Sequence, residues 1–309
     1  MTIKTQRLLD RARKLGKKGN SEEAKKLYAS ILKDSPLNLE AKNALLLIEK
    51  FKGEERAPKK VLQSVIALYS NGQAQEALNK IEALVKIFPK EPILYNISGG
   101  CYQSIGQLNN AVKSFEKALK IKPKFPEAQY NLGVAFKELG QVNSAKKCYE
   151  SVLILNHAYP NVHNNLGNIF LELNEINSAI DHFEWAVAYQ PEFAKAHNNL
   201  GNSLLAIGRT EDAIKSYETA LSLEPDAFDA NNNLGVALHK IGQLDNAIKF
   251  YQKALMLNIN YALAHNNLGN AYKDLGQIDK SVMCYEKAIS IKPSYKEAKN
   301  SLEKMKSSK

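Results

Sequence analysis

The chain has 309 residues, of which 44% are hydrophobic, and its formal net charge is +10. No stretch approaches 18 uninterrupted apolar residues, which argues against a transmembrane helix. The first 20 residues contain seven lysines or arginines and no apolar run of the kind found in secretory signals, so we expect a cytoplasmic protein without membrane contact.

The excess of positive charge lies at the two ends of the chain. Residues 1–60 contain 16 basic and 8 acidic residues, and residues 292–309 contain 6 and 2. The segment between them contains 20 basic and 22 acidic residues. Because a nucleic-acid-binding protein needs a basic surface along its binding face, this distribution argues against nucleic acid as the partner.

A helix–turn–helix pattern of 34 residues recurs along the chain, and its first copy, at residues 5–38, is diverged. Residues 41–51 then predict one further helix, but the charged run 52–57 follows where its partner helix would begin. We expect this unpaired helix to be either a brace for the preceding hairpin or a hinge. Its apolar face, which needs a partner, favours the brace. Residues 1–57 are therefore expected to form a separate N-terminal segment.

Seven full copies of the repeat fill residues 58–295 without an insertion. They begin at Pro58, Pro92, Pro126, Pro160, Ala194, Phe228 and Ala262. The eighth position is glycine in six copies and Val65 in the first, and the twentieth is alanine or Ser281. Small side chains let two helices approach closely, so these columns predict where the first helix of a copy crosses the second. The twenty-fourth position holds a large side chain, Ile81 or an aromatic residue, to fill the space around the crossing.

Two further columns predict the helix ends. The fifteenth position is glycine in every copy except one, where it is Asn174, and both residue types accept a left-handed backbone. Proline near the end of five copies stops the second helix.

These columns resemble the tetratricopeptide repeat, a helix–turn–helix of this length. One copy carries the family's pattern as Asn199-Leu200-Gly201, followed by Ala213, Tyr217, Ala220 and Pro225. The resemblance implies an all-α fold, a right-handed superhelix in which neighbouring repeats bury each other's apolar faces. It also implies a concave groove lined by the first helices, in which such proteins bind other proteins.

Residues 296–309 are expected to contain a capping helix, at 296–306, and a basic tail. Ala298, Leu302 and Met305 lie on one stripe of that helix, and charged side chains cover the rest. One apolar and one charged face suit a helix that ends the array.

The sequence offers no site for chemistry, so we expect neither catalysis nor a cofactor nor a metal. It contains no glycine-rich phosphate loop, zinc motif or nucleophile elbow. His163, His197 and His265 recur at the fourth position, where we expect half-buried packing residues. Cys101, Cys148 and Cys284 lie in different repeats and are expected to be free thiols.

The feature that points to function is a set of asparagine columns in the first helices. Asparagine is a mediocre helix former, so its recurrence in mid-helix needs a reason. The sixth position carries Asn131, Asn165, Asn199, Asn233 and Asn267; the fifth carries Asn164, Asn198, Asn232 and Asn266; and the ninth carries Asn168, Asn202 and Asn270. A primary amide both donates and accepts hydrogen bonds, as does a peptide backbone. These columns therefore predict a groove that binds an extended peptide by its main chain.

The sixth-position column resembles the asparagine ladder in the repeat domain of the O-GlcNAc transferases, which grips substrate peptides. For this column the resemblance favours binding, whereas repeat duplication explains the fifth and ninth columns equally well. Replacing sixth-position residues by alanine is expected to weaken binding and to leave the helices at least as stable. The carboxylate clamp of other family members needs several basic groove residues, and Lys195 alone among the central repeats supplies one at the second position.

Two classes of function remain open. The chain is either a scaffold or adaptor that binds a peptide segment of a partner protein, or the substrate-recruiting module of a glycosyltransferase, sulfotransferase or oxygenase assembly whose catalytic domain lies elsewhere. The capping helix favours the scaffold. The sequence does not indicate an oligomeric state.

Overall fold

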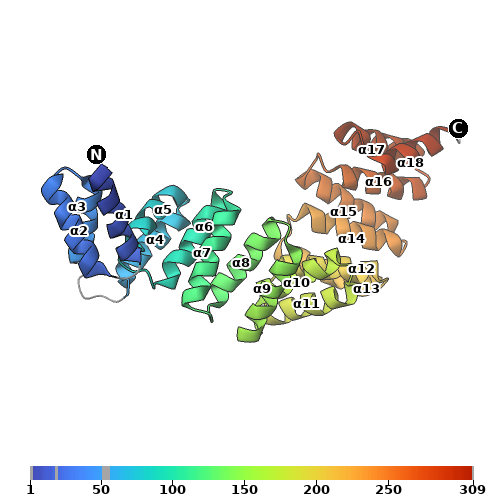
Figure 1. Ribbon diagram of the computed structural model, residues 1–309. Coiled ribbons are helices and arrows are strands. Elements are labelled where there is room, and N and C mark those ends of the chain that lie inside the picture. The colour runs from blue at the N-terminus through green and yellow to red at the C-terminus, as the bar shows by residue number, and fades with distance from the viewer. Residues whose placement is uncertain (1–2, 18–19, 51–55, 308–309) are drawn as a thin grey trace. The chain divides into compact units, whose positions relative to one another are not determined.

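The computed structural model describes residues 3–17, 20–50 and 56–307, and within them every regular element is an α-helix. The helices are α1 (Ile3–Lys17), α2 (Ser21–Asp34), α3 (Leu39–Lys50), α4 (Lys59–Ser70), α5 (Ala74–Leu84), α6 (Pro92–Ser104), α7 (Leu108–Ile121), α8 (Pro126–Glu138), α9 (Val142–Leu155), α10 (Pro160–Glu172), α11 (Ile176–Tyr189), α12 (Ala194–Ala206), α13 (Thr210–Leu223), α14 (Phe228–Lys240), α15 (Leu244–Leu257), α16 (Ala262–Asp274), α17 (Ile278–Ile291) and α18 (Lys296–Ser307) (Figure 1). The all-α repeat fold expected from the sequence is confirmed.

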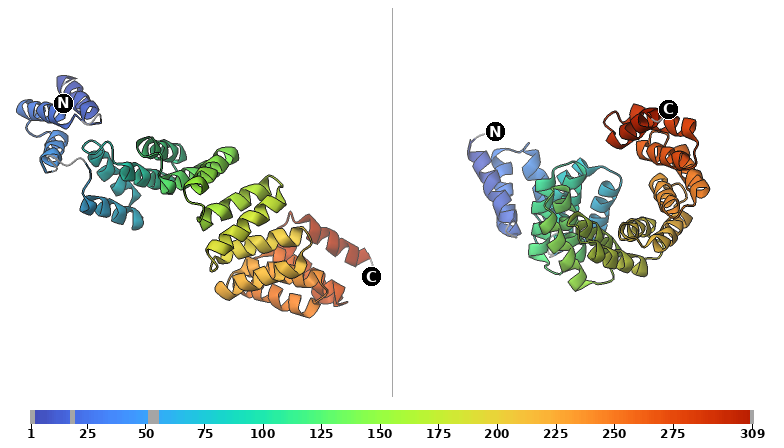
Figure 2. Two further views of the ribbon diagram at one scale, coloured as in Figure 1. Left: turned by 90° about the horizontal axis from the view of Figure 1, so that it is seen from below. Right: turned by 90° about the vertical axis from the view of Figure 1, so that its right-hand side faces the viewer.

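The helices form two compact units, Met1–His157 (unit 1) and Ala158–Lys309 (unit 2). Within each unit the first helix of a repeat packs on the second, and the second packs on the first helix of the next repeat. Successive first helices also touch, as α12 and α14 do. The helices of unit 2 follow one another along an arc (Figure 2).

The crossing of the two helices in a repeat depends on the eighth-position glycines. A Cβ atom added to Gly133 would lie 2.6 Å from the ring of Tyr149, and the equivalent distances in the four later repeats are 2.5 to 2.8 Å. In the first full repeat, Val65 and Ile81 replace glycine and the aromatic residue, and both are buried. The predicted close approach is therefore confirmed, and the sizes of the two facing residues are complementary.

The predicted turns are also confirmed. All six glycines of the fifteenth column have a positive φ, from 72° at Gly140 to 84° at Gly208, and Asn174 in the same column has a φ of 62°. Each lies just after a first helix. A left-handed residue at this point reverses the chain so that the second helix packs back on the first.

The unpaired helix α3 packs on the N-terminal hairpin and also reaches the repeats that follow. Ala41 and Ile48 are buried in one apolar cluster with residues of α1 and α2, and Leu47 packs against the cluster formed by α4, α5 and α6. On its outer side Leu39 and Leu46 are exposed. Of the charged run at 52–57, residues 52–55 lie outside the described residues.

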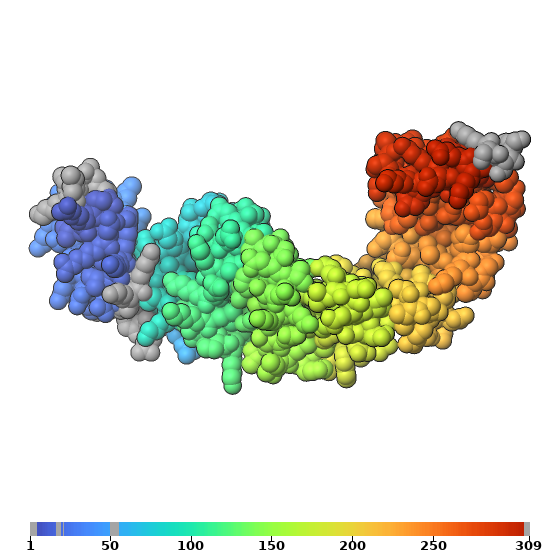
Figure 3. Space-filling model, turned by 45° about the vertical axis from the view of Figure 1, so that its right-hand side comes forward, coloured from blue at the N-terminus to red at the C-terminus, as the bar shows by residue number. Residues whose placement is uncertain are grey.

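Helix α18 is held by the stripe predicted from the sequence. Ala298 and Met305 are buried beside Tyr285 and Ala288 of α17, and Leu302 packs against the same cluster. In the space-filling view the red atoms of α17 and α18 form one continuous surface (Figure 3).

Candidate functional site

The three asparagine columns differ in how far they are exposed. The four fifth-position residues are at most 8% exposed, whereas the five sixth-position residues are half-buried. In the ninth column Asn202 is exposed, and Asn168 and Asn270 are half-buried. The sixth and ninth positions are one helical turn apart, so they share one face of each first helix. We call this face, which is open to solvent, the amide face.

Hydrogen bonds link the fifth and sixth columns from one repeat to the next. In unit 2, Asn199 Nδ2 donates to Asn164 Oδ1 at 2.9 Å. Asn233 donates to Asn198 at 3.2 Å, and Asn267 donates to Asn232 at 3.0 Å. In unit 1 the same bond runs from Asn131 to Asn96 at 3.1 Å. We call this series the amide ladder. It makes the fifth column a set of buried acceptors that hold the sixth-position side chains in place.

The amide ladder ends at Asn266. Its Oδ1 atom is buried and has no hydrogen-bond partner. The sixth position of the following helix, α18, is Ser301, whose side chain is shorter than that of asparagine. The last acceptor of the series therefore lacks its donor.

Tyrosines of the twenty-fourth column orient two ninth-position amides. The hydroxyl of Tyr217 donates to Asn202 Oδ1 at 2.8 Å, and that of Tyr285 donates to Asn270 Oδ1 at 2.7 Å. In this arrangement Oδ1 of each amide faces the tyrosine hydroxyl and Nδ2 faces away from it. The Nδ2 group of each then has no partner among the described residues.

Two amide pairs on the amide face therefore offer complementary groups one turn apart: Asn199 with Asn202, and Asn267 with Asn270. In each pair the sixth-position amide donates through Nδ2 and leaves its Oδ1 as an acceptor. Asn199 Nδ2 also lies 3.4 Å from Asn168 Oδ1, to which it donates. The ninth-position amide uses its Oδ1 and leaves Nδ2 as a donor. Between the two pairs, the ninth position of α14 is Val236.

A second set of polar contacts joins successive first helices near their C-terminal ends. In unit 1, Gln103 donates to Glu138 at 2.7 Å, and in unit 2 His239 and Asp274 are 2.9 Å apart. The pKa of the Asp274 carboxyl is lowered, because hydrogen bonds and charge from His239 and Lys273 outweigh the opposing effect of its partial burial. The sequence analysis missed these contacts, since the residues at these two positions differ between repeats.

Several fourth-position residues are hydrogen-bond donors, so the packing role that we expected for the histidines is incomplete for His197 and His265. Nε2 of His197 lies 2.9 Å from the Pro191 carbonyl oxygen, and Nε2 of His265 lies 2.9 Å from that of Ile259. Asn231 makes the equivalent bond to the Pro225 carbonyl at 3.2 Å. A carbonyl only accepts, so Nε2 carries the proton in both histidines. Each bond ties a first helix to the loop that precedes it.

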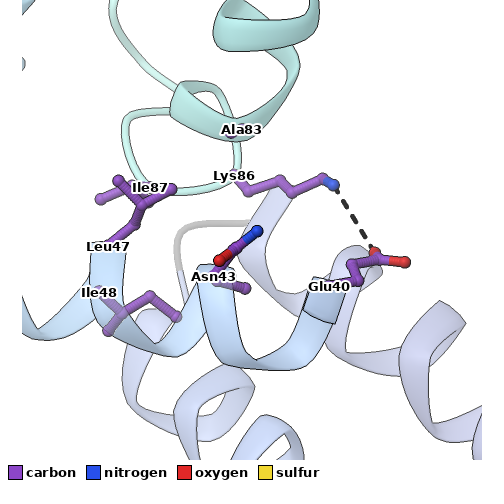
Figure 4. A pocket seen from close by; sticks show the side chains of 8 residues that line it. Glu40, Asn43, Leu47, Ile48, Ala83, Lys86 and Ile87 are labelled. Atoms are coloured by element: carbon purple, nitrogen blue, oxygen red, sulfur yellow. Dashed lines mark ion pairs between the residues drawn. The ribbon is translucent and has the colours of Figure 1, made fainter. Parts of the chain in front are cut away.

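A small pocket in unit 1 separates α3 from the end of α5 (Figure 4). Leu47, Ile48 and Ile87 give it apolar walls, and the ion pair of Lys86 with Glu40 closes one end at 3.8 Å. Glu40 also accepts two hydrogen bonds from Arg13, which lower the pKa of its carboxyl. The charges at this pocket are therefore already neutralised within the chain.

The described residues include no group of three or more His, Cys, Asp or Glu side chains that could hold a metal ion. Cys101, Cys148 and Cys284 are free thiols, as expected. Burial raises the pKa of each to about 11, so none is an activated nucleophile at neutral pH. In the part of the chain that the structure describes, no helix is long and apolar enough to span a membrane.

Comparison with known families matches the repeat itself. Models of the tetratricopeptide repeat match residues 126–156, 164–214, 198–262 and 262–295, and a TPR repeat model matches residues 101–140. The chain belongs to the tetratricopeptide repeat family. As a tetratricopeptide repeat array, it is a protein-interaction scaffold.

Solved structures show the same tetratricopeptide repeat fold. Cut9–Hcn1, a hetero-tetramer of the APC/C, is similar at 20% identity and a TM-score of 0.64, over 96% of this chain and 55% of that one. The C-terminal part of a TPR repeat-containing protein from Cytophaga hutchinsonii is 17% identical over 78% of this chain and 99% of that one, with a TM-score of 0.60. YrrB, described as a TPR protein with an unusual peptide-binding site, is 22% identical over 62% and 98%, with a TM-score of 0.54. Among curated proteins, none shows significant similarity.

Proposed function

We propose that this tetratricopeptide repeat protein binds an extended peptide segment of a partner protein by its main chain, on the amide face of unit 2. The observation that carries the proposal is the arrangement of the two amide pairs, in which Asn199 and Asn267 donate to the ladder and the oxygens of Asn202 and Asn270 face tyrosine hydroxyls. An extended peptide presents N–H and C=O groups together along each edge, and each amide pair offers an acceptor and a donor one helical turn apart. Main-chain recognition of this kind would be independent of the ligand's side chains.

The charges around the amide face support a ligand without a strong net charge. The second positions of α12, α14 and α16 are Lys195, Asp229 and Leu263, which differ in sign and character. A groove for acidic tails would need several basic residues at these places. We therefore infer that the asparagine amides, and not ion pairs, provide the affinity.

The spacing of the amide pairs sets a minimum length for the ligand. They lie two repeats apart on helices whose neighbours touch. At about 10 Å between packed helix axes, the span is roughly 20 Å, or about six residues of extended chain at 3.3 Å each. Peptides shorter than this would reach one amide pair only.

The test uses immobilised full-length protein and a library of random dodecapeptides, followed by affinity measurements on the enriched peptides. The double variant Asn202→Asp with Asn270→Asp keeps the oxygens that accept from the two tyrosines and removes the donors offered to the ligand. We expect it to bind the enriched peptides about tenfold more weakly, the usual effect of losing one or two hydrogen bonds. Truncation of an enriched peptide below six residues should weaken its binding to the wild type by a similar factor.

Asn246→Asp is the control for the added charge, because this exposed residue lies on α15 and its side chain bonds, among the described residues, to Gln243. It should bind like the wild type. If the wild type enriches no peptide, or if the double variant binds as tightly as the control, main-chain recognition by the amide face is wrong.

A further inference from the structure

Helix α6 contains two successive glycines, and only the first is explained by the repeat. Gly99 occupies the eighth position, where the ring of Phe115 leaves no room for a side chain. Gly100 occupies the ninth position, which in the other repeats carries a side chain. A glycine in mid-helix is destabilising relative to alanine, so its presence on the amide-face side of α6 needs a separate cause.

The neighbour of Gly100 is a tyrosine from the preceding repeat. A Cβ atom at residue 100 would lie 2.8 Å from the hydroxyl oxygen of Tyr69 and 3.0 Å from its Cζ. Tyr69 is in α4, at the twelfth position of the repeat that begins at Pro58, and α4 and α6 are in contact. The absence of a side chain at residue 100 thus allows the tyrosine ring to lie across α6.

The ring and its surroundings form an apolar surface that is open to solvent. Tyr69 is 40% exposed, and Ile66, one turn earlier on the same face of α4, is 44% exposed. The structure shows no hydrogen-bond partner for the Tyr69 hydroxyl among the residues it describes. Two large apolar side chains exposed side by side in this way have no structural role in the core.

This surface adjoins the amide ladder of unit 1. Asn96 is one turn before Gly100 on α6, so the two share a face, and Asn96 accepts the hydrogen bond from Asn131. A peptide whose main chain lies at Asn131 would place its next residues over α6 and α4. Along an extended chain every second side chain points to the same side, so one of them would meet Tyr69 and Ile66.

We propose that Tyr69 and Ile66, with Gly100 as the floor beneath the ring, form a subsite for a bulky apolar side chain of a peptide segment whose main chain lies along the amide ladder of unit 1. The subsite rests on the proposed function in that it takes the same class of ligand, an extended peptide, and it adds side-chain selectivity to recognition that is otherwise made through the main chain. Its occupant is leucine, isoleucine, methionine or phenylalanine, because the ring face and the branched aliphatic side chain offer apolar contact and no charge.

The direct test is an NMR titration of the full-length protein, with labelled isoleucine δ1 methyl groups, using N-acetyl-leucinamide as the probe. We expect a saturable shift of the Ile66 methyl signal and no comparable shift at Ile154, which is 84% exposed on α9. N-acetyl-lysinamide should shift neither. An Ile66 signal that does not respond to N-acetyl-leucinamide overturns the proposal.

Gly100→Ala is the matched variant. Its new methyl group would displace the end of the Tyr69 ring while improving helix propensity, so the protein should fold as the wild type does by circular dichroism. We expect at least fivefold weaker binding of the probe, as for Tyr69→Ala. Unchanged binding in both variants would mean that the ring is not part of a subsite.

The two proposals fail separately. The probe is a single capped residue and does not need the amide pairs of unit 2, so the titration decides the subsite even if the peptide library enriches nothing. The double Asn→Asp variant, which changes unit 2 only, should leave the shift of the Ile66 methyl signal by the probe unchanged.

Discussion

The ring of Tyr217 lies against the backbone of Gly201, so closely that a Cβ atom on residue 201 would be 2.6 Å from Cε1 of the ring. The hydroxyl of the same tyrosine donates to Asn202, the next residue along α12. One side chain therefore sets both the crossing of α12 with α13 and the orientation of an amide on the solvent-exposed face. Packing and the candidate binding site are linked at this tyrosine.

Gly201→Ala should destabilise unit 2 by about 1–3 kcal/mol, because the added methyl group overpacks the helix crossing. Combining Gly201→Val with Tyr217→Ile, which reproduces the buried pair of Val65 and Ile81, should recover most of the loss. Gly208→Ala is a control in which any loss of stability has a different cause. No atom lies within 4 Å of an added Cβ at residue 208, but the φ of 84° is strained for alanine. Urea unfolding followed by circular dichroism measures all three, and no loss in Gly201→Ala would contradict the crossing.

Ser301→Asn should stabilise the C-terminal end by about 1 kcal/mol, because it supplies the donor that the buried Oδ1 of Asn266 lacks. The new amide would extend the amide ladder by one bond. Ser301→Ala offers no donor and should give no such gain. Equal stability of the two variants, measured by hydrogen exchange in α16 and α18, would show that Asn266 gains nothing from a donor at residue 301.

Leu302→Glu should release α18, since the carboxylate cannot stay charged against the cluster around Tyr285 without a large cost. Repeats are coupled mainly to their neighbours, so the damage should begin as fraying of residues 262–306 and not as collapse of the whole chain. The newly exposed apolar surface should favour self-association at high concentration. Lys299→Glu, an exposed position on the same helix, is the control. If the Leu302→Glu variant shows the same hydrogen-exchange protection as the wild type and no added self-association, the expectation that α18 caps the array is wrong.

His265 should make unit 2 less stable as the pH falls below about 6.5, the ordinary pKa of histidine. Burial lowers the pKa of His265 in the folded chain, and Lys287 acts in the same direction against the hydrogen bond to Ile259. The unfolded chain therefore takes up a proton at a higher pH than the folded chain, so stability is full above that pH and decreases below it. His265→Asn introduces the residue type that the preceding repeat has at the same position, Asn231. Asparagine keeps a hydrogen-bond donor there and does not titrate. The unfolding free energy of the wild type minus that of the variant should therefore decrease from pH 7.5 to pH 5.5. A difference that stays constant over this range would contradict the assignment to His265.

The sequence predicted the fold because each structural requirement recurs in a fixed column. Residue 201 is glycine because the Tyr217 ring packs against it, and residue 208 is glycine because the turn needs a positive φ. Both reasons could be inferred from the position of each residue in the repeat. The amide face was also predicted as a surface, but the roles within it were not. Nothing in the sequence shows that Asn164 is a buried acceptor while Asn199 is its donor, because that bond joins residues 35 positions apart.

This distinction changes one expectation. From helix propensity alone, replacing Asn199 by alanine should leave the array as stable as before or more so. In the structure the same change removes the donor to a buried oxygen, so we now expect a loss of about 1–3 kcal/mol that offsets any gain in propensity. Tyr69 and Gly100 were missed for a related reason: their contact is made once, and a single pair leaves no column.

The amide ladder also bears on how such an array can change its length. Four sixth-position asparagines, Asn131, Asn199, Asn233 and Asn267, bond to an asparagine at the fifth position of the repeat before. The bond is therefore defined between any two adjacent copies that carry both residues and not between two particular copies. Deleting residues 194–227 would bring Asn233 opposite Asn164, with donor and acceptor in the same places that Asn199 and Asn164 hold now. Whole copies that carry both asparagines can therefore be removed, duplicated or exchanged by recombination without new compensating substitutions at the junction. A deletion whose length is not a multiple of 34 residues would break the ladder bond that crosses it.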